Sequence, residues 1–301
     1  MAVQNDYDRA ARYLAKMEPE AFCSWCLRLS RESFRFVGWL DTRTIPFPGS
    51  ADRTCDTVAH VERTDPPGQP WAIPLEFQVE PDSLMFGRFL EYLGRMWVSE
   101  KPFTERGDRY CLAAAVINLT GAGQAKRVFD WYECGMLTAL SPSERNLSEE
   151  PADRTLAEIE AGTVGRVILP LVPLMAGGRE SPIIERWVRI AESEPDVRKR
   201  SDIGTLARIF SRLSHAPDAW QSVLKEWNVI RSPVADEFRA EGELRGKVAA
   251  LVAFLEARFQ SIPNDLVQRI GELGDVATLT RMLPLAATSA SLSDFRKDAG
   301  L

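Results

Sequence analysis

The 301-residue sequence predicts an α/β protein in which a mixed β-sheet is flanked by helices and followed by an α-helical C-terminal region. Two observations support this fold class. In the first half, short runs with an apolar residue at every second position, typical of strands, alternate with runs of helical spacing. From Pro151 onward, nearly every patterned run is helical. Because a strand–helix–strand order favours parallel pairing of the two strands, the sheet is expected to be mixed.

The first half of the chain is expected to begin with a helix and continue as the sheet. Large apolar residues and cysteines recur at helical spacing over residues 19–40, and the segment 45–49, with two prolines and a glycine, predicts a loop. Residues 141–150 are polar and predict a linker. Between these segments the patterns predict, in order, strands over 54–61 and 71–79, a helix over 83–99, and strands over 110–119 and 127–133.

The second half is expected to be helical. The expected domains are a core over 15–180, a helical region over 181–232 and a small helical domain over 233–301. The apolar side of the helix expected over 234–259 suits packing or self-association, so a homo-oligomer formed through the C-terminal helices is a further prediction. Helical spacing predicts helices over 153–161, 182–193, 201–214, 218–227 and 234–259, with shorter helices over 264–298.

The net charge of −6 lies in residues 1–180, which hold 20 Lys+Arg against 26 Asp+Glu. A nucleic-acid-binding protein usually carries a basic excess, because contacts with phosphates supply much of its affinity. Nucleic acid is therefore the expected ligand only if basic groups gather on one face or a partner supplies them.

Other features of composition bear on location and redox chemistry. No apolar run approaches the length of about eighteen residues that a membrane span needs, so no membrane partner is expected. Residues 1–16 lack the apolar core of a secretory signal, which predicts a cytoplasmic location. Five cysteines, an odd number, argue against structural disulfides. Cys23 and Cys26 are expected to be buried helix residues, because no second pair of ligands has the spacing of a zinc site.

Acidic residues on two neighbouring strands suggest a metal site. In the run 71–79, Glu76 and Gln78 share the polar face, and Asp56 on the preceding strand is expected beside them. Mg²⁺ prefers oxygen ligands, and a bound metal stabilises charge that develops on a phosphate and activates an attacking water. Gln78 can hydrogen-bond a water but carries no positive charge. The alternative is that Asp56 and Glu76 are ordinary polar residues on a solvated face of the sheet.

Three short motifs carry a resemblance to a known family. The chain resembles the Rpn/YhgA-like group of recombination-promoting nucleases and transposase-like proteins, which belongs to the PD-(D/E)xK nuclease superfamily. Members of that group show an Asp, then an apolar-Glu-x-Gln strand, then a helix with Arg-x-x-x-Tyr, and the match covers about residues 19–119. The C-terminal region also resembles the small domain called DUF4351. The motifs are Cys55-Asp56-Thr57-Val58, Leu75-Glu76-Phe77-Gln78 and Arg88-Phe89-Leu90-Glu91-Tyr92.

The resemblance implies a restriction-endonuclease-like core that cleaves DNA with Mg²⁺, or with Mn²⁺ as the alternative metal, and a link to recombination or mobile elements. By motif, Asp56 and Glu76 become metal ligands and catalytic residues, and Gln78 takes the place of the superfamily's lysine. Arg88 is expected to bind a phosphate of the substrate or to hold a carboxylate of the site. The alternative is that Arg88 pairs with Glu91 or another surface acid, and Tyr92 is expected to pack in the core. A helical acid often completes such sites, and Glu20 and Glu32 are both candidates.

Two other functions stay open. The acidic core and the missing lysine favour a catalytically inactive protein that keeps the nuclease fold as an interaction or regulatory module. A phosphoester hydrolase acting on small molecules is the third hypothesis, since an acidic surface does not hinder it.

Overall fold

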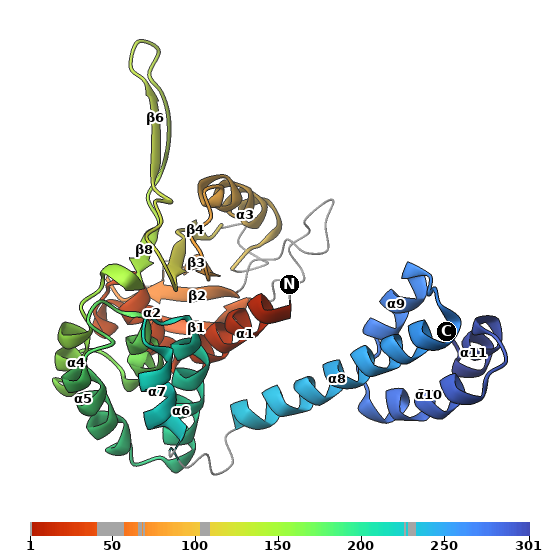
Figure 1. Cartoon of the computed structure of the whole chain (residues 1–301). Coiled ribbons are helices and arrows are strands. Elements are labelled where there is room, and N and C mark those ends of the chain that lie inside the picture. Colours follow the sequence, from red (N-terminus) through yellow and green to blue (C-terminus); the bar gives the residue numbers. More distant parts are fainter. Residues whose placement is uncertain are drawn as a thin grey trace. The chain divides into compact units, whose positions relative to one another are not determined.

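The computed structural model describes residues 2–40, 57–65, 68, 70–102, 109–225, 227 and 233–301. The chain divides into two compact units, Met1–Ile230 and Arg231–Leu301 (Figure 1). The first unit contains a sheet with helices on both faces, and the second is helical. The predicted class, an α/β fold with a mixed sheet flanked by helices and a helical C-terminal part, is therefore confirmed.

The main sheet combines antiparallel and parallel pairing. The first three strands pair antiparallel, whereas β3, β5 and β8 pair parallel. The helix α3 (Met85–Ser99) connects β3 to the next strands of the sheet, which pair parallel with β3 as the sequence predicts. The strands lie in the order β1 (Phe34–Leu40), β2 (Thr57–Arg63), β3 (Pro70–Gln78), β5 (Ala115–Asn118) and β8 (Ser143–Asn146), and β4 (Cys111–Leu112) also pairs with β3.

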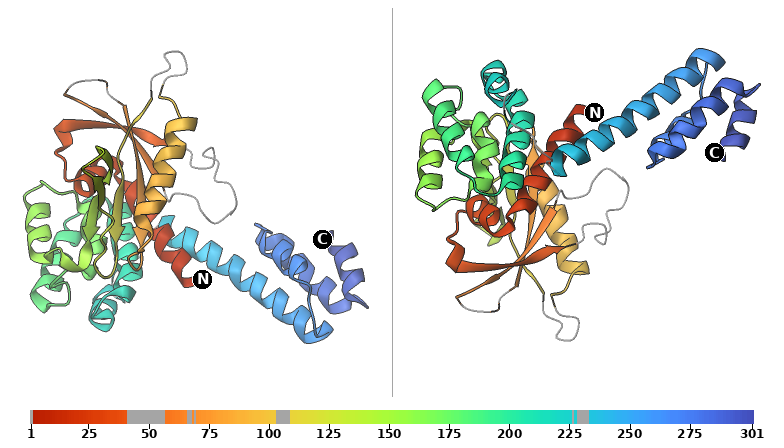
Figure 2. Two further views of the ribbon diagram at one scale, coloured as in Figure 1. Left: turned by 90° about the horizontal axis from the view of Figure 1, so that it is seen from above. Right: turned by 90° about the horizontal axis from the view of Figure 1, so that it is seen from below.

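Helices cover both faces of this sheet (Figure 2). Side chains of α3, among them Phe89 and Tyr92, form a core with Ala72 and Val116 of the strands. On the opposite face lie α1 (Ala2–Met17) and α2 (Pro19–Leu27), and the Phe22 ring of α2 is 6.0 Å from the Phe77 ring. The central strand β3 is consequently buried on both faces. The expectation of a solvated polar face is wrong, because α3 covers it.

The helix predicted over 19–40 is shorter than expected. It ends at Leu27, where Arg28 adopts a left-handed conformation (φ 57°) and its N–H closes the last turn. A short 3₁₀ turn, η1 (Arg31–Ser33), then leads into β1. Apolar residues between 34 and 39 fit both helical and alternating spacing, and pairing with β2 decides in favour of the strand.

The polar segment 141–150 is not a linker. It forms the edge strand β8 and the 3₁₀ turn η3 (Leu147–Glu149), because its polar side chains find partners inside the unit. The strand predicted over 110–119 is present as the two pieces β4 and β5. The strand expected over 127–133 is β6 (Arg127–Trp131), which pairs antiparallel with β7 (Met136–Leu140) to form a separate hairpin.

The rest of the first unit is helical and packs around tryptophans. Trp187 and Trp220 are fully buried, with ring centroids 5.4 Å apart, and each indole N–H donates to a backbone carbonyl. These tryptophans are core residues of the first unit. The elements are α4 (Ala152–Glu160), η4 (Arg166–Leu174), α5 (Ser181–Glu192), α6 (Val197–Phe210), η5 (Ser211–Leu213) and α7 (Pro217–Lys225).

The second unit has its own apolar core. Its helices are α8 (Pro233–Phe259), α9 (Asn264–Gly271), α10 (Val276–Thr288) and α11 (Leu292–Ala299). The carboxylate of Asp275 caps α10 by accepting from two backbone N–H groups, and Ser291 caps α11 in the same way with one. Leu251, Leu255, Leu279, Met282 and Phe295 are among the buried side chains. Among the described residues, no helix combines the length and apolarity that crossing a membrane requires.

Candidate functional site

Glu76 lies near the carboxyl end of the central strand β3. In the parallel pairing of β3 with β5, Glu76 lies opposite Val116. The helix α3 covers the face of the sheet on which the Glu76 side chain lies. The side chain is 1% exposed, so the carboxylate is almost fully removed from water. Burial of an unpaired carboxylate costs several kcal/mol, so the surroundings of Glu76 must supply compensating charge and hydrogen bonds.

Arg88 on α3 supplies that charge. Its Nη2 donates to Glu76 Oε2 over 3.0 Å, its Nη1 to Asp82 Oδ2 over 3.1 Å, and its Nη2 also to the Tyr92 hydroxyl over 2.9 Å. Arg88 and Tyr92 are four residues apart on one helical face, which brings the hydroxyl beneath the guanidinium. The structure therefore shows Arg88 bound to the carboxylate of Glu76, and its contact with a substrate phosphate stays a prediction. Tyr92 is 2% exposed and packs in the core, as predicted.

Gln78 completes the described part of this group. Its amide Nε2 donates to Glu76 Oε2 over 3.3 Å, so two side chains bind the same carboxylate oxygen. Asp56 lies outside the described residues. The last described pair between β2 and β3 is Thr57 opposite Leu75, and Asp56 precedes Thr57 in the sequence. The expected meeting of Asp56 with Glu76 stays a prediction.

The electrostatics of the group keep Arg88 charged. Burial alone would lower the pKa of the guanidinium, but the Glu76 carboxylate, with smaller contributions from Tyr92 and Asp82, raises it above its ordinary value. Arg88 is 31% exposed and Glu76 only 1%. The positive group therefore reaches solvent while the negative group does not.

An open cleft of about 630 Å³ borders this group. Arg88 and Asp82 line one side at the start of α3, and Arg127 and Phe129 of the β6–β7 hairpin line the other. The Phe129 ring contacts the Phe86 ring of α3, with centroids 5.5 Å apart. The guanidinium of Arg127 donates to the backbone carbonyls of residues 124 and 126. Two arginines thus face a space that a ligand can enter.

The described donors suit a magnesium ion in kind but not in number. Glu76, Asp82 and Gln78 offer the oxygen atoms that Mg²⁺ prefers. Across the described ranges, however, no group of three or more His, Cys, Asp or Glu side chains could hold a metal ion. A complete site would need a further ligand, and Asp56 is the residue that the sequence nominates.

The two candidate helical acids do not join this group. Glu20 begins α2, which lies on the face of the sheet opposite α3. Glu32 lies in η1, where a hydrogen bond from the Ser30 hydroxyl, at 2.6 Å, lowers the pKa of its exposed carboxyl. The acid that lies near Glu76 is instead Asp82, which follows β3 and is linked to Glu76 through Arg88. Sequence reasoning missed Asp82, although its place directly after the strand could have indicated it.

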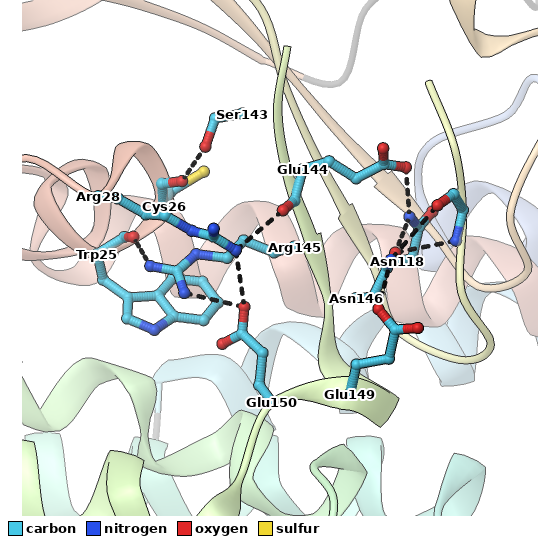
Figure 3. A network of polar contacts seen from close by, with 11 residues as sticks. Trp25, Cys26, Arg28, Asn118, Ser143, Glu144, Arg145, Asn146, Glu149 and Glu150 are labelled. Atoms are coloured by element: carbon cyan, nitrogen blue, oxygen red, sulfur yellow. Dashed lines mark hydrogen bonds and ion pairs between the residues drawn. The ribbon is translucent and has the colours of Figure 1, made fainter. Parts of the chain in front are cut away.

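A second arginine–carboxylate cluster lies at the edge strand β8 (Figure 3). Arg145 of β8 donates from Nη1 to Glu150 over 2.9 Å and from Nη2 to the Trp25 carbonyl, and its guanidinium lies 4.5 Å from the centroid of the Trp25 ring. Arg28 donates to the backbone carbonyl of Glu144. This cluster joins α2 to β8 and to the turn that follows β8.

The buried Asn118 organises a third polar group, next to the second (Figure 3). Its amide donates to Glu144 over 3.1 Å and to Asn146 over 2.7 Å, both on β8. The Glu144 carboxylate also accepts from the backbone N–H of Ala125, and the Asn146 side-chain oxygen accepts from that of Gly123. The turn after β5 is therefore fixed to β8 by its own backbone. Sequence reasoning missed this group, because its polar residues were assigned to a linker.

Comparison of the chain with protein-family models, with curated proteins and with solved structures found no match. The assignment to the Rpn/YhgA-like group therefore depends on the sequence motifs at Asp56, Glu76–Gln78 and Arg88–Tyr92, and it stays a prediction. The geometry around Glu76 is independent of that assignment.

Proposed function

We propose that the protein is a metal-dependent DNA endonuclease with a restriction-endonuclease-like core, in which Asp56 and Glu76 hold Mg²⁺ or Mn²⁺. The observation that carries this proposal is the carboxylate of Glu76, 1% exposed at the end of a central strand and bound by Arg88 beside an open cleft. A buried ionisable group at a cleft, with a specific charged partner, is typical of a functional site.

The neighbouring side chains have distinct roles in this proposal. Gln78, which already donates to Glu76, orients the attacking water by hydrogen bonding. Arg88 and Arg127 bind phosphate oxygens from the two sides of the cleft, which places positive charge where DNA needs it despite the net charge of −6. The metal, when bound, would stabilise charge on the phosphate and lower the pKa of a water.

Cleavage of supercoiled plasmid DNA with Mg²⁺ or Mn²⁺ tests this function. Because the ligands act as a unit, we expect Asp56→Ala and Glu76→Gln each to lower the nicking rate at least ~100-fold. Glu150→Gln is a matched control, since it also removes an Arg-bound carboxylate but in the second cluster, and its nicking rate should stay within about twofold of the wild type. Undiminished nicking by both site variants, or no nicking by folded wild-type protein, contradicts the proposal.

The second candidate function is a non-catalytic interaction or regulatory module. One observation favours it: Arg88 already binds Glu76, so a cation entering the site competes with a guanidinium for this carboxylate. Titration calorimetry with Mg²⁺ and Mn²⁺ separates the two candidates. Metal binding that is lost in Glu76→Gln supports the nuclease, whereas the absence of both metal binding and nicking supports the module.

A further inference from the structure

The β6–β7 hairpin, residues 127–140, is an arm that extends away from the main sheet of the first unit (Figure 1). Among the described strands, β6 and β7 pair only with each other, so each keeps one unpaired edge. A two-stranded ribbon is marginal by itself in water, and an open edge is a template for another strand. This arm therefore has the backbone features of an interaction surface.

The side chains of the arm are apolar on both faces. In the antiparallel register, Phe129 and Trp131 share one face with Met136, whereas Val128 shares the other with Leu137. Contiguous apolar exposure of this extent marks binding surfaces on soluble proteins. The exposed fractions are 54% for Val128, 58% for Phe129, 60% for Trp131, 84% for Tyr132, 56% for Met136 and 62% for Leu137.

The charges of the arm select the partner. Lys126 and Arg127 lie at its base, and Asp130 and Glu133 lie toward its tip. Residues 127–140 hold one positive and two negative charges, and Lys126, just before the arm, only makes the numbers equal. The arm therefore lacks the basic excess that DNA or an anionic membrane would require. If a second arm lies beside the first in the opposite direction, Lys126 and Arg127 of each copy lie next to Asp130 and Glu133 of the other. The arm is thus complementary to itself in one orientation.

We propose that two copies of this chain associate through their β6–β7 arms, laid side by side in opposite directions so that base meets tip. The proposal does not depend on the nuclease function. It also uses a surface different from the C-terminal helices, through which the sequence predicts self-association.

Sedimentation equilibrium of the full chain tests the apolar contact. We expect wild-type protein to dimerise with a Kd of about 10 μM or tighter, and Trp131→Ser with Leu137→Ser, one change on each face, to weaken dimerisation at least tenfold. Trp97→Ser with Val98→Ser is the matched control, because these side chains are similarly exposed on α3, at 50% and 72%, away from the arm. A wild-type monomer, or a dimer unaffected by the arm variant, overturns the proposal.

Charge reversal tests the orientation. Lys126→Glu with Arg127→Glu makes the whole arm acidic, and Asp130→Lys with Glu133→Lys makes it basic, so each variant alone should dimerise at least tenfold more weakly. Mixing the two variants should restore dimers, as should all four changes in one chain, because base and tip again carry opposite charges. Failure of both restorations contradicts the antiparallel arrangement. Arm-dependent sedimentation of a monomer with anionic vesicles would overturn the proposal in favour of a membrane partner.

Discussion

Two arginine–carboxylate groups in the first unit use similar side chains but are fixed in different ways. Arg145 is 13% exposed and Glu150 15%, and Arg145 also binds a backbone carbonyl and lies over the Trp25 ring. Arg88 is 31% exposed, whereas Glu76 is 1% exposed, and the described hydrogen bonds of Arg88 go to side chains. The Arg145 group is anchored by a backbone carbonyl and an aromatic ring, whereas the Arg88 group is anchored by side chains that can rotate.

This difference separates a structural ion pair from a site that can exchange its cation. Arg145 is held by the carbonyl and the indole ring of Trp25, so its guanidinium can leave this position only if β8 and α2 separate. A guanidinium held by side chains can move aside when another cation or an anionic ligand competes. The Arg88 group therefore suits function, and the Arg145 group suits architecture.

The largest effect is expected from Arg88→Met. Because the change leaves the buried Glu76 carboxylate without this partner, the free energy of unfolding should fall by about 4 kcal/mol. Urea unfolding measures the loss, and Mg²⁺ at millimolar concentration should recover part of it. Glu76→Gln in the same chain should recover more than half of the loss. Additive losses in the double variant would show that the two side chains are not coupled.

Arg145→Met should have a smaller effect. It removes charged hydrogen bonds and a cation–π contact at a partly solvated position, so we expect a loss of about 2 kcal/mol. The same unfolding experiment should show no recovery with Mg²⁺. Metal-dependent recovery equal to that of Arg88→Met would remove the distinction between the two groups.

Gly123→Ala tests how rigid the hydrogen-bonded group around Asn118 is. A Cβ at this position would lie 2.4 Å from the Asn118 amide nitrogen and 2.6 Å from a Glu144 carboxylate oxygen. Since both atoms are held by other hydrogen bonds, the free energy of unfolding should fall by about 1.5 kcal/mol. Gly94→Ala, on the exposed side of α3 with no neighbour within 4 Å, should instead be neutral or stabilising. Equal effects of the two changes would argue against a rigid network.

The smallest effect is expected on thiol reactivity. Burial raises the pKa of Cys26 to about 12, and the carbonyl of Cys26 binds Ser143 next to Arg145. Iodoacetamide at about pH 8 should therefore modify the exposed Cys134 and leave Cys26 unmodified in wild-type protein, as peptide mass spectrometry would show. Because the Arg145 guanidinium lowers the pKa of Cys26, Arg145→Met should leave Cys26 unmodified in the folded protein, and so should Arg88→Met. Rapid modification of Cys26 in wild-type protein contradicts this assignment.

The sequence predicts the centre of the fold better than its edges. The strand that carries Glu76 and the helix that carries Arg88 have strong patterns, so the sequence predicts both, and the structure shows the contact between Arg88 and the Glu76 carboxylate. The strand β1 was predicted as helix, because its aromatic spacing fits both periods. The strand β8 was missed because Glu144, Arg145 and Asn146 look like surface residues until tertiary partners are known. The contact of Asp56 lies outside the described residues.

The parallel pairing in the main sheet has a consequence for the order of folding. It joins β3 to β5 and β5 to β8, segments that are tens of residues apart in the chain, so long loops must close before these contacts form. The contacts of α8 to α11 connect helices that follow one another closely. In refolding kinetics, the C-terminal unit should therefore reach its native state first, although the ribosome makes it last.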